Sequence, residues 1–213
     1  MHSFDSFIKR LEKSLAGNLP GQYSQYKLAP LVRKDQMRKI KDPSAGTPSG
    51  VLILFYPENE EIIIPFIRRP RYDGVHSGQI AFPGGKYEKD DKNLRATALR
   101  EAREEIGIDP SGIRIIGELT SLYIPPSNFN VLPVVAYSES IPEFTIDPAE
   151  VDHMLKFSIR EILNRKSLTK KGISMSNGMV FNTPCFLIRD QVIWGATAMM
   201  LNEMIDVIRM PGY

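Results

Sequence analysis

The hydrophobic positions near the start of the chain repeat with the period of a helix. They are Phe4, Phe7, Ile8, Leu11 and Leu15, and they predict an amphipathic helix from about residue 3 to 16 that ends near Gly17 and Pro20. A polar, basic stretch follows, which favours a solvated surface segment, and residues 42–50 have the composition of a loop. We therefore expect residues 1–45 to form an N-terminal helix and extension ahead of a main domain over residues 46–213.

Within the main domain, apolar runs of strand length alternate irregularly with helical patterns. Residues 51–56 and 61–67 predict a hairpin, as do residues 181–188 and 192–194, and strands are also expected at 79–82, 113–120 and 128–138. Helical patterns cover 94–106 and 196–208, and residues 150–164 mix a short strand with a helix. Because there is no regular βαβ alternation, we predict an α+β fold with a mixed β-sheet sandwiched between α-helices.

Composition and charge exclude several classes of protein. Of the 213 residues, 42% are hydrophobic and the net charge is +2, too small to argue for a nucleic acid or an anionic membrane as partner. No run of about 18 apolar residues exists, and the first residues lack the apolar core of a signal peptide. The single cysteine, Cys185, lies in an apolar run and reads as a buried small hydrophobe. A reducing, cytoplasmic setting is the simplest expectation.

The candidate chemistry is a carboxylate triplet at the end of the predicted helix 94–106. Glu101, Glu104 and Glu105 stand at positions i, i+3 and i+4, which places them on one helix face, where like charges cost a few tenths of a kcal/mol per pair. In the last turn, before Gly107, each negative charge also opposes the helix dipole by roughly 0.3–1 kcal/mol. A turn that breaks two local rules usually serves a site. Hard divalent cations, which prefer oxygen ligands, would remove both penalties.

The residues around this triplet resemble the Nudix hydrolase signature, G-x5-E-x7-R-E-U-x-E-E-x-G-U, where U is aliphatic. The run Arg100–Ile108 fills its second half. The first half departs from the pattern, because Gly85 lies fifteen residues before Arg100 where the signature has fourteen. The first glutamate position falls on Asp91 counted forward and on Lys92 counted back, so the role of Asp91 is open.

Upstream residues are similar to the extended signature of the coenzyme A pyrophosphatase branch of Nudix enzymes, which tolerates this one-residue insertion. Arg69 and the run His76–Gly85 carry the resemblance, and the segment Ile193–Ala198 looks like the ending of the branch. Two positions differ, since Ile67 replaces a threonine of the signature and Pro70 a serine.

The resemblance implies a Nudix fold and a metal-dependent pyrophosphohydrolase that uses Mg²⁺ or Mn²⁺. The metal ligands it implies are Glu101, Glu104, Glu105 and the carbonyl of Gly85. Glu104, Glu105 and Arg100 take the catalytic roles, with Arg100 holding a carboxylate of the cluster in place through a charge-assisted hydrogen bond. Arg69, Gly84 and Gly85 are the expected substrate-binding residues, and the guanidinium of Arg69 offers a bidentate fork to phosphate.

The resemblance also implies a small nucleoside diphosphate derivative as partner, with coenzyme A or its derivatives expected, cut to 3′,5′-ADP and 4′-phosphopantetheine. ADP-ribose, NADH or another such derivative is the first alternative, a nucleotide-binding module without turnover the second, and a metal-free structural domain the third. No nucleic acid or membrane partner is expected, and a homodimer is left open.

Several residues keep two interpretations. The general base is either a glutamate of the helix or one of Glu139, Glu143 and Glu150, for each of which a plain surface role is favoured. For His76, a structural hydrogen bond is favoured over catalysis. For Trp194, anchoring of the last helix is favoured over stacking on an adenine.

Overall fold

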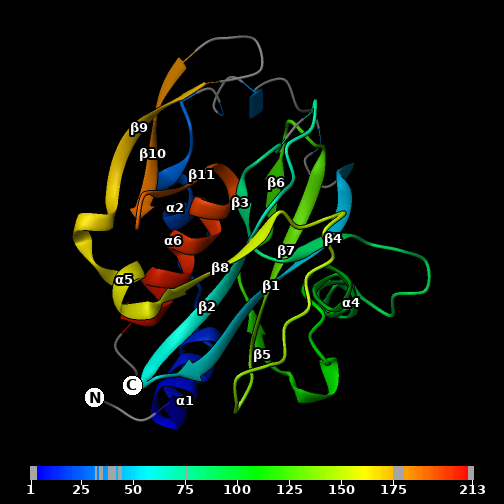
Figure 1. The fold of residues 1–213 in the computed structure, drawn as a ribbon. Coiled ribbons are helices and arrows are strands. Elements are labelled where there is room, and N and C mark those ends of the chain that lie inside the picture. The colour runs from blue at the N-terminus through cyan, green and yellow to red at the C-terminus, as the bar shows by residue number, and fades with distance from the viewer. Residues whose placement is uncertain are drawn as a thin grey trace.

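The computed structural model describes residues 4–31, 33, 36, 37, 42, 45–74, 76–174 and 180–210 (Figure 1). An eight-stranded sheet follows the order β3-β2-β1-β7-β5, and β4, β6 and β8 pair with β1, β7 and β2. Its strands are β1 (Thr47–Glu58), β2 (Glu61–Arg68), β3 (Ile80–Ala81), β4 (Gly84–Lys86), β5 (Arg114–Glu118), β6 (Leu122–Ile124), β7 (Phe129–Tyr137) and β8 (His153–Ser158). The sheet is mixed because β1 runs parallel to β7 and antiparallel to β2.

A second, three-stranded sheet and the helices complete the described fold. The smaller sheet has the order β11-β10-β9 and consists of β9 (Leu168–Ser174), β10 (Val180–Ile188) and β11 (Gln191–Trp194). The α-helices are α1 (Phe4–Leu15), α2 (Gly21–Gln25), α4 (Leu94–Ile106), α5 (Ile159–Leu163) and α6 (Gly195–Arg209). Among the helices in the described part of the chain, none combines the length and the apolar composition needed to cross a membrane.

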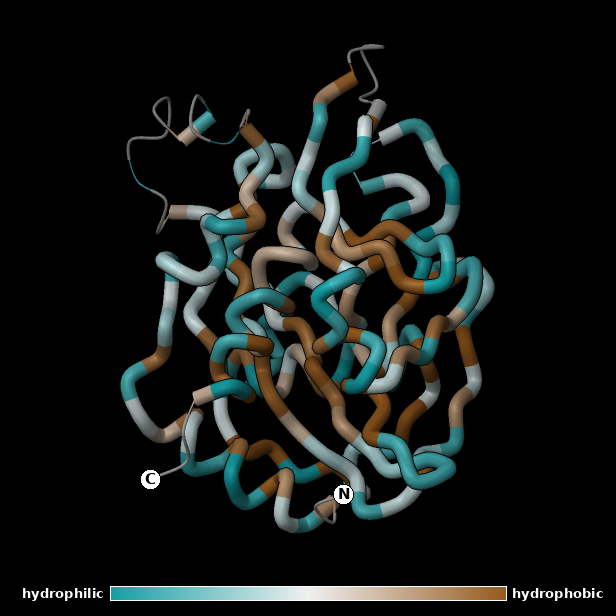
Figure 2. Tube along the Cα trace, turned by 90° about the vertical axis from the view of Figure 1, so that its left-hand side faces the viewer, coloured by the Kyte–Doolittle hydropathy of each residue, from teal (hydrophilic) through white to brown (hydrophobic). Residues whose placement is uncertain are grey.

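The alternation of side chains along β1 divides the core into two layers. Ile53 and Phe55 belong to the cluster that includes α1 and α6, whereas Leu52, Leu54 and Tyr56 belong to the cluster that includes α4. Hydrophobic stretches accordingly run through the interior and hydrophilic turns surround them (Figure 2). The sheet thus lies between helices, as the α+β prediction required.

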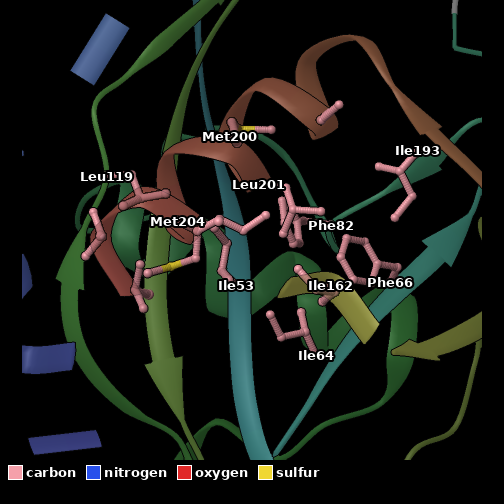
Figure 3. Packing of buried hydrophobic residues seen from close by; sticks show 14 of the residues in the cluster. Ile53, Ile64, Phe66, Phe82, Leu119, Ile162, Ile193, Met200, Leu201 and Met204 are labelled. Carbon is pink, nitrogen blue, oxygen red and sulfur yellow. The ribbon is translucent and has the colours of Figure 1, made fainter. Parts of the chain in front are cut away.

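Methionine side chains of α6 fill the first of these layers. Met200 and Met204 pack with Leu201 in the cluster that contains Ile53 and Phe66 (Figure 3). Met199 and Met204 are fully buried. These methionines therefore serve packing, and the predicted burial of Cys185 in β10 is confirmed.

The two predicted hairpins both form, and each closes through a two-residue turn. Asn59 and Glu60 join β1 to β2 with φ of 50° and 63°, and Arg189 and Asp190 join β10 to β11 with φ of 47° and 64°. Two consecutive positive φ angles are what a type I′ turn needs, and that turn follows the twist of the strands it connects.

Three details of the predicted secondary structure are wrong. Thr47–Gly50 form the start of β1 and not a loop, because they pair with β7 over Thr47↔Phe129 to Gly50↔Leu132. β1 also extends through Pro57 and Glu58, which shortens the predicted turn. β4, β6, β9 and α2 were not expected, since their short or polar sequences show no clear apolar period.

Buried polar contacts join the N-terminal segment to the last helix. Glu203 of α6 is fully buried and accepts hydrogen bonds from Gln25 Nε2 at 2.7 Å and from the amide of Gly21 at 3.2 Å. Helix α1 buries its apolar face in the same core layer as α6. The division into residues 1–45 and 46–213 stays a prediction.

Candidate active site

Helix α4 is fixed at both ends by the residues that its sequence supplies. The Asn93 side chain accepts a hydrogen bond from the amide of Ala96 at 3.1 Å, and Gly107 ends the helix in the left-handed conformation with φ of 71°. Ala98, Ala102 and Ile106 are fully buried against β1. Glu101 and Glu105 lie next to this buried side of α4, where β4 packs against the helix.

Glu105 is the buried carboxylate of this group, with 2% of its surface exposed. Its Oε2 accepts a hydrogen bond from the amide of Gly84 at 2.7 Å. Burial raises its pKa to about 8, a shift that the Arg69 charge and the Gly84 amide oppose and that the charges of Glu101 and Glu150 increase. A cation bound beside Glu105 would offset this effect of burial and favour the ionised carboxylate.

Two further carboxylates complete a cluster around Glu105. Glu101, Glu105 and Glu150 each offer an oxygen, and these oxygens lie within 4.8 Å of one another. Burial also raises the pKa of Glu101; Arg100 opposes this, and Glu104 and Glu150 add to it. Three oxygens at this spacing with unfavourable mutual charge fit a hard divalent cation, which would relieve the repulsion.

Gly85 faces this cluster from β4, where it pairs with Gly50 of β1. A Cβ added at Gly85 would lie 2.4 Å from the carboxyl carbon of Glu101. The absence of a side chain is what lets the Glu101 carboxylate reach this part of β4. Gly84 beside it has a φ of +150° and a Cβ there would meet the Gly50 carbonyl at 2.4 Å, so the Gly84–Gly85 pair has a steric basis.

Arg100 distributes its guanidinium over three carboxylates and one carbonyl. Nη1 lies 2.8 Å from Glu104 Oε2 and 3.0 Å from Glu101 Oε1, and Nη2 donates to the Lys86 carbonyl at 2.9 Å. Nε and Nη2 each lie 3.0 Å from an oxygen of Asp91. Arg100 thus holds Glu101 and Glu104 from one side, and its catalytic role stays a prediction.

Arg69 approaches the cluster from the end of β2. Its Nη2 donates to the Gly84 carbonyl at 3.3 Å, and its amide donates to the Gln79 carbonyl at 3.0 Å. The ring Nδ1 of His76 lies 3.2 Å from Gln79 Oε1. Burial lowers the pKa of His76, the Gln79 contact opposes this and the Arg69 charge adds to it. Arg69 therefore lies between the carboxylates and the 71–79 loop.

A comparison with known families shows to which family the chain belongs. The family model described as NUDIX domain matches residues 46–174, well over half of the chain. The chain belongs to the Nudix hydrolase family. It is therefore an enzyme that acts on phosphoric anhydrides, which removes the non-catalytic alternatives.

The chain is also similar to individual proteins and solved structures. The chain is 32% identical to the uncharacterized Nudix hydrolase NudL of Yersinia pestis over 153 residues, 67% of this chain and 76% of that protein. The structure of the MutT protein from Methanosarcina mazei aligns with a TM-score of 0.49 at 18% identity, over 78% of this chain and 96% of that one. The Nudix domain of Shewanella oneidensis NrtR, solved with ADP ribose, aligns with a TM-score of 0.45 at 16% identity, over 61% and 85%.

In this Nudix hydrolase, Asp91 is a structural partner of Arg100 and lies outside the carboxylate cluster. It is buried and also accepts hydrogen bonds from Thr97 Oγ1 at 2.9 Å and from the Glu88 amide at 3.0 Å. The Arg100 guanidinium is the main reason that the pKa of Asp91 falls to about 2. The residue that the signature left open thus ties the 87–92 loop to α4.

The positions of Glu104 and Glu150 differ from what the sequence pattern indicated: Glu104 lies outside the carboxylate cluster and Glu150 lies within it. Glu104 is about half exposed and pairs with Arg100, apart from the group formed by Glu101, Glu105 and Glu150. The chain after β7 reaches α4 because the Thr145 amide donates to the Ile106 carbonyl and the Asp147 amide to the Glu105 carbonyl. These backbone contacts bring Glu150 to the cluster from 45 residues downstream.

The other downstream acids do not join this cluster. Glu139 pairs with Arg114 at 3.0 Å on the surface, and Glu143 is exposed. Sequence reasoning named Glu150 only as one of three acids in the right region. Its selection depends on loop contacts between backbone groups, for which a single sequence carries no signal.

Proposed function

We propose that this Nudix hydrolase cleaves the diphosphate of coenzyme A or its derivatives to 3′,5′-ADP and 4′-phosphopantetheine, with Mg²⁺ or Mn²⁺ as cofactor. The observation that carries the hydrolytic part is the cluster of Glu101, Glu105 and Glu150 facing Gly85. The substrate rests on the similarity of Arg69 and the His76–Gly85 run to the coenzyme A branch.

The residues of the cluster suit the roles that the reaction needs. Glu101, Glu105 and Glu150 would hold the cation, and the second oxygen of Glu104 and the Gly85 carbonyl are further candidate ligands. A bound divalent cation neutralises the diphosphate and lowers the pKa of an attacking water. In the hydrolysis, the water oxygen bonds to one phosphorus while the bond from that phosphorus to the bridging oxygen breaks.

Two arginines act around this chemistry. Arg100 fixes Glu101 and Glu104 through its Nη1, so that they need not reorganise during the reaction. Arg69 is close enough to Glu105 for its charge to lower the pKa of that acid, and it would offer its guanidinium to a phosphate oxygen at the same point.

The cysteine content and the net charge of the chain bear on its compartment and its partners. A single cysteine, buried in β10, agrees with a reducing compartment, and we propose the cytoplasm. The small net charge of +2 gives no reason to add a nucleic acid or a membrane surface to the partners. A homodimer stays open.

A substrate panel tests the proposal. The wild-type protein is assayed with Mg²⁺ or Mn²⁺ on coenzyme A, acetyl-coenzyme A, ADP-ribose and NADH, with kcat/KM as the measure and with product identification by mass. Coenzyme A or its acetyl derivative should rank first and yield 3′,5′-ADP. If ADP-ribose or NADH ranks far above both, the coenzyme A assignment is wrong and the hydrolase assignment is unaffected.

A further inference from the structure

A large cavity lies beside β3, outside the carboxylate cluster. Its volume is about 610 Å³, a size typical of sites for nucleotides and other small molecules. The residues around it come from the stretch before β1, the 71–79 loop, the end of β6, the strands β9–β11 and the start of α6. β3 contacts β11, so the C-terminal hairpin reaches this place, as Figure 1 shows. We call this space the Trp194 cavity.

The wall of the Trp194 cavity is mainly apolar and rich in aromatic rings. Tyr72, Phe181 and Trp194 line it together with Met199. Trp194 is half-buried, and a neighbouring cavity of about 430 Å³ is also lined by Trp194 and Gln79, so space continues on both sides of the indole. Flat rings beside an open volume suit a planar heterocycle, which can stack on them.

A buried positive charge lines the same cavity. Arg33 is only 5% exposed, and its Nη2 donates to the Tyr123 carbonyl at 2.6 Å. Its Nε has no hydrogen-bond partner among the described residues. A buried guanidinium with an unused donor is costly unless an acceptor, preferably an anion, completes it. A phosphate group has the geometry and charge to do so.

Short contacts connect this cavity to the carboxylate cluster. Gln79 lines the cavity, and its carbonyl accepts from the Arg69 amide. Arg69 Nη2 donates to the Gly84 carbonyl, and the Gly84 amide donates to Glu105. Three successive hydrogen bonds thus lead from the cavity wall to the buried glutamate. The Gln79 wall of the cavity and Glu105 are therefore neighbours in the fold, an arrangement that suits a substrate lying across both.

We infer that the Trp194 cavity binds the adenine nucleotide half of the substrate, with the base against Trp194 and a phosphate on Arg33. The inference rests on the proposed function for the identity of the substrate. The pantetheine half of coenzyme A has no aromatic ring, so the rings of Tyr72, Phe181 and Trp194 favour the nucleotide half. Arg33 and Trp194 are then specificity residues that lie outside the residues matched to the Nudix domain.

Trp194 is the single tryptophan of the chain, so its fluorescence reports on the space around this one indole. The full-length protein is titrated with adenosine 3′,5′-bisphosphate and, separately, with 4′-phosphopantetheine, each with and without Mg²⁺. We expect a saturable change in Trp194 emission with the bisphosphate, at concentrations at least tenfold lower than any change with 4′-phosphopantetheine. No saturable change with the bisphosphate, or a stronger response to 4′-phosphopantetheine, overturns the inference.

Variants separate the base contact from the phosphate contact, with calorimetry as the measurement. Trp194→Leu should weaken the bisphosphate by about 5- to 100-fold, and Trp194→Phe should restore most of the affinity. Arg33→Met should weaken the bisphosphate by about 10- to 100-fold and leave the affinity for adenosine unchanged. Tyr23→Leu is the matched control, because Tyr23 is 80% exposed on α2, and it should change nothing.

The folded state of each variant is checked by thermal unfolding. If Arg33→Met does not fold, the Trp194 pair still decides the inference, since Trp194→Leu with wild-type affinity contradicts it. The outcome is also separable from that of the proposed function. Hydrolysis of coenzyme A without a Trp194 response leaves the function standing and the inference wrong. A Trp194 response to the bisphosphate without hydrolysis of coenzyme A leaves the nucleotide site standing and the proposed coenzyme A hydrolysis wrong.

Discussion

Asp91 and Arg100 form a two-pronged ion pair in which Nε and Nη2 of the arginine each lie 3.0 Å from a different carboxylate oxygen. The pair leaves Nη1 of Arg100 for Glu101 and Glu104. The loop before α4 therefore determines where the guanidinium is held, and the guanidinium determines where two glutamates point. A change in the position of Asp91 would therefore move the Arg100 guanidinium and, with it, the carboxylates of Glu101 and Glu104.

The Asp91–Arg100 pair predicts an acid-sensitive contribution to stability. Asp91→Asn should lower the free energy of unfolding at pH 7 by about 2 kcal/mol, because the folded-state pKa of about 2 lies below the ordinary 3.8. A lowered pKa stabilises the fold above about pH 4, and this contribution is lost as the pH falls towards 2. Urea unfolding across this range should show the difference between wild type and variant shrinking.

Asp90→Asn is the matched control, since Asp90 is the exposed neighbour in the same loop. It should leave the unfolding free energy within about 0.5 kcal/mol of wild type. Equal effects of the two substitutions, or a difference that does not depend on pH, would show that Asp91 contributes nothing through its charge.

Gly85→Ala tests the close approach of β4 to α4. The added Cβ would meet the carboxyl group of Glu101 at 2.4 Å, so that carboxylate must leave its place while the backbone remains. We expect kcat to fall by at least about 100-fold, because a displacement near 1 Å at a catalytic group has this order of cost. The measurement is steady-state kinetics together with a thermal melt.

Gly112→Ala is the control for this substitution, because a Cβ at Gly112 has no atom within 4 Å. It should leave both activity and stability unchanged. Full activity of Gly85→Ala would mean that the Glu101 carboxylate does not need its place beside β4.

The fold was largely accessible from the sequence because its signals are local. Apolar alternation and turn residues predicted both hairpins, and the apolar period with Gly107 predicted the limits of α4. β9 and α2 were missed because their stability comes from partners far along the chain, such as the β10 pairing and the Glu203 contacts with Gln25 and Gly21. No local pattern encodes such contacts.

The candidate site divides in the same way. Glu101, Glu105, Arg100 and Gly85 are brought together as the spacing on one helix and one glycine pair suggested. The part played by Asp91 and the arrival of Glu150 could not be predicted, because both depend on how loops fold back on α4. The ligand roles themselves stay predictions.

The buried Glu105 predicts an opposite pH dependence from that of Asp91. In the metal-free protein its pKa is raised from 4.5 to about 8, so ionisation costs stability, and the unfolding free energy should fall as the pH rises from about 4.5 to 8. Glu105→Gln keeps an acceptor for the Gly84 amide and removes the charge. At pH 8–9 the free energy of unfolding of the metal-free variant should therefore be higher than that of the metal-free wild type by roughly 2–5 kcal/mol.

Addition of a divalent cation should make the wild type more stable than Glu105→Gln. Mg²⁺ or Mn²⁺ binds the ionised cluster of the folded state and raises the melting temperature of wild type in a concentration-dependent way. Glu105→Gln should show a much smaller rise and a kcat reduced by orders of magnitude. A pH-independent difference between the two metal-free proteins would contradict the raised pKa.

Glu104 and Glu150 provide the sharpest test of which carboxylates hold the metal. Glu150 lies within the cluster and Glu104 is paired with Arg100 outside it, so Glu150→Gln should weaken Mn²⁺ binding at least about tenfold. Glu104→Gln should reduce kcat, because Glu104 is an expected catalytic residue, and its effect on Mn²⁺ affinity measures whether its second oxygen reaches the cation. Glu143→Gln, an exposed acid of the same loop, is the control and should bind Mn²⁺ as wild type does. Mn²⁺ titration followed by electron paramagnetic resonance measures all three affinities. A loss of Mn²⁺ affinity in Glu104→Gln alone would mean that the metal lies along the exposed face of α4 and that Glu150 is a surface acid after all.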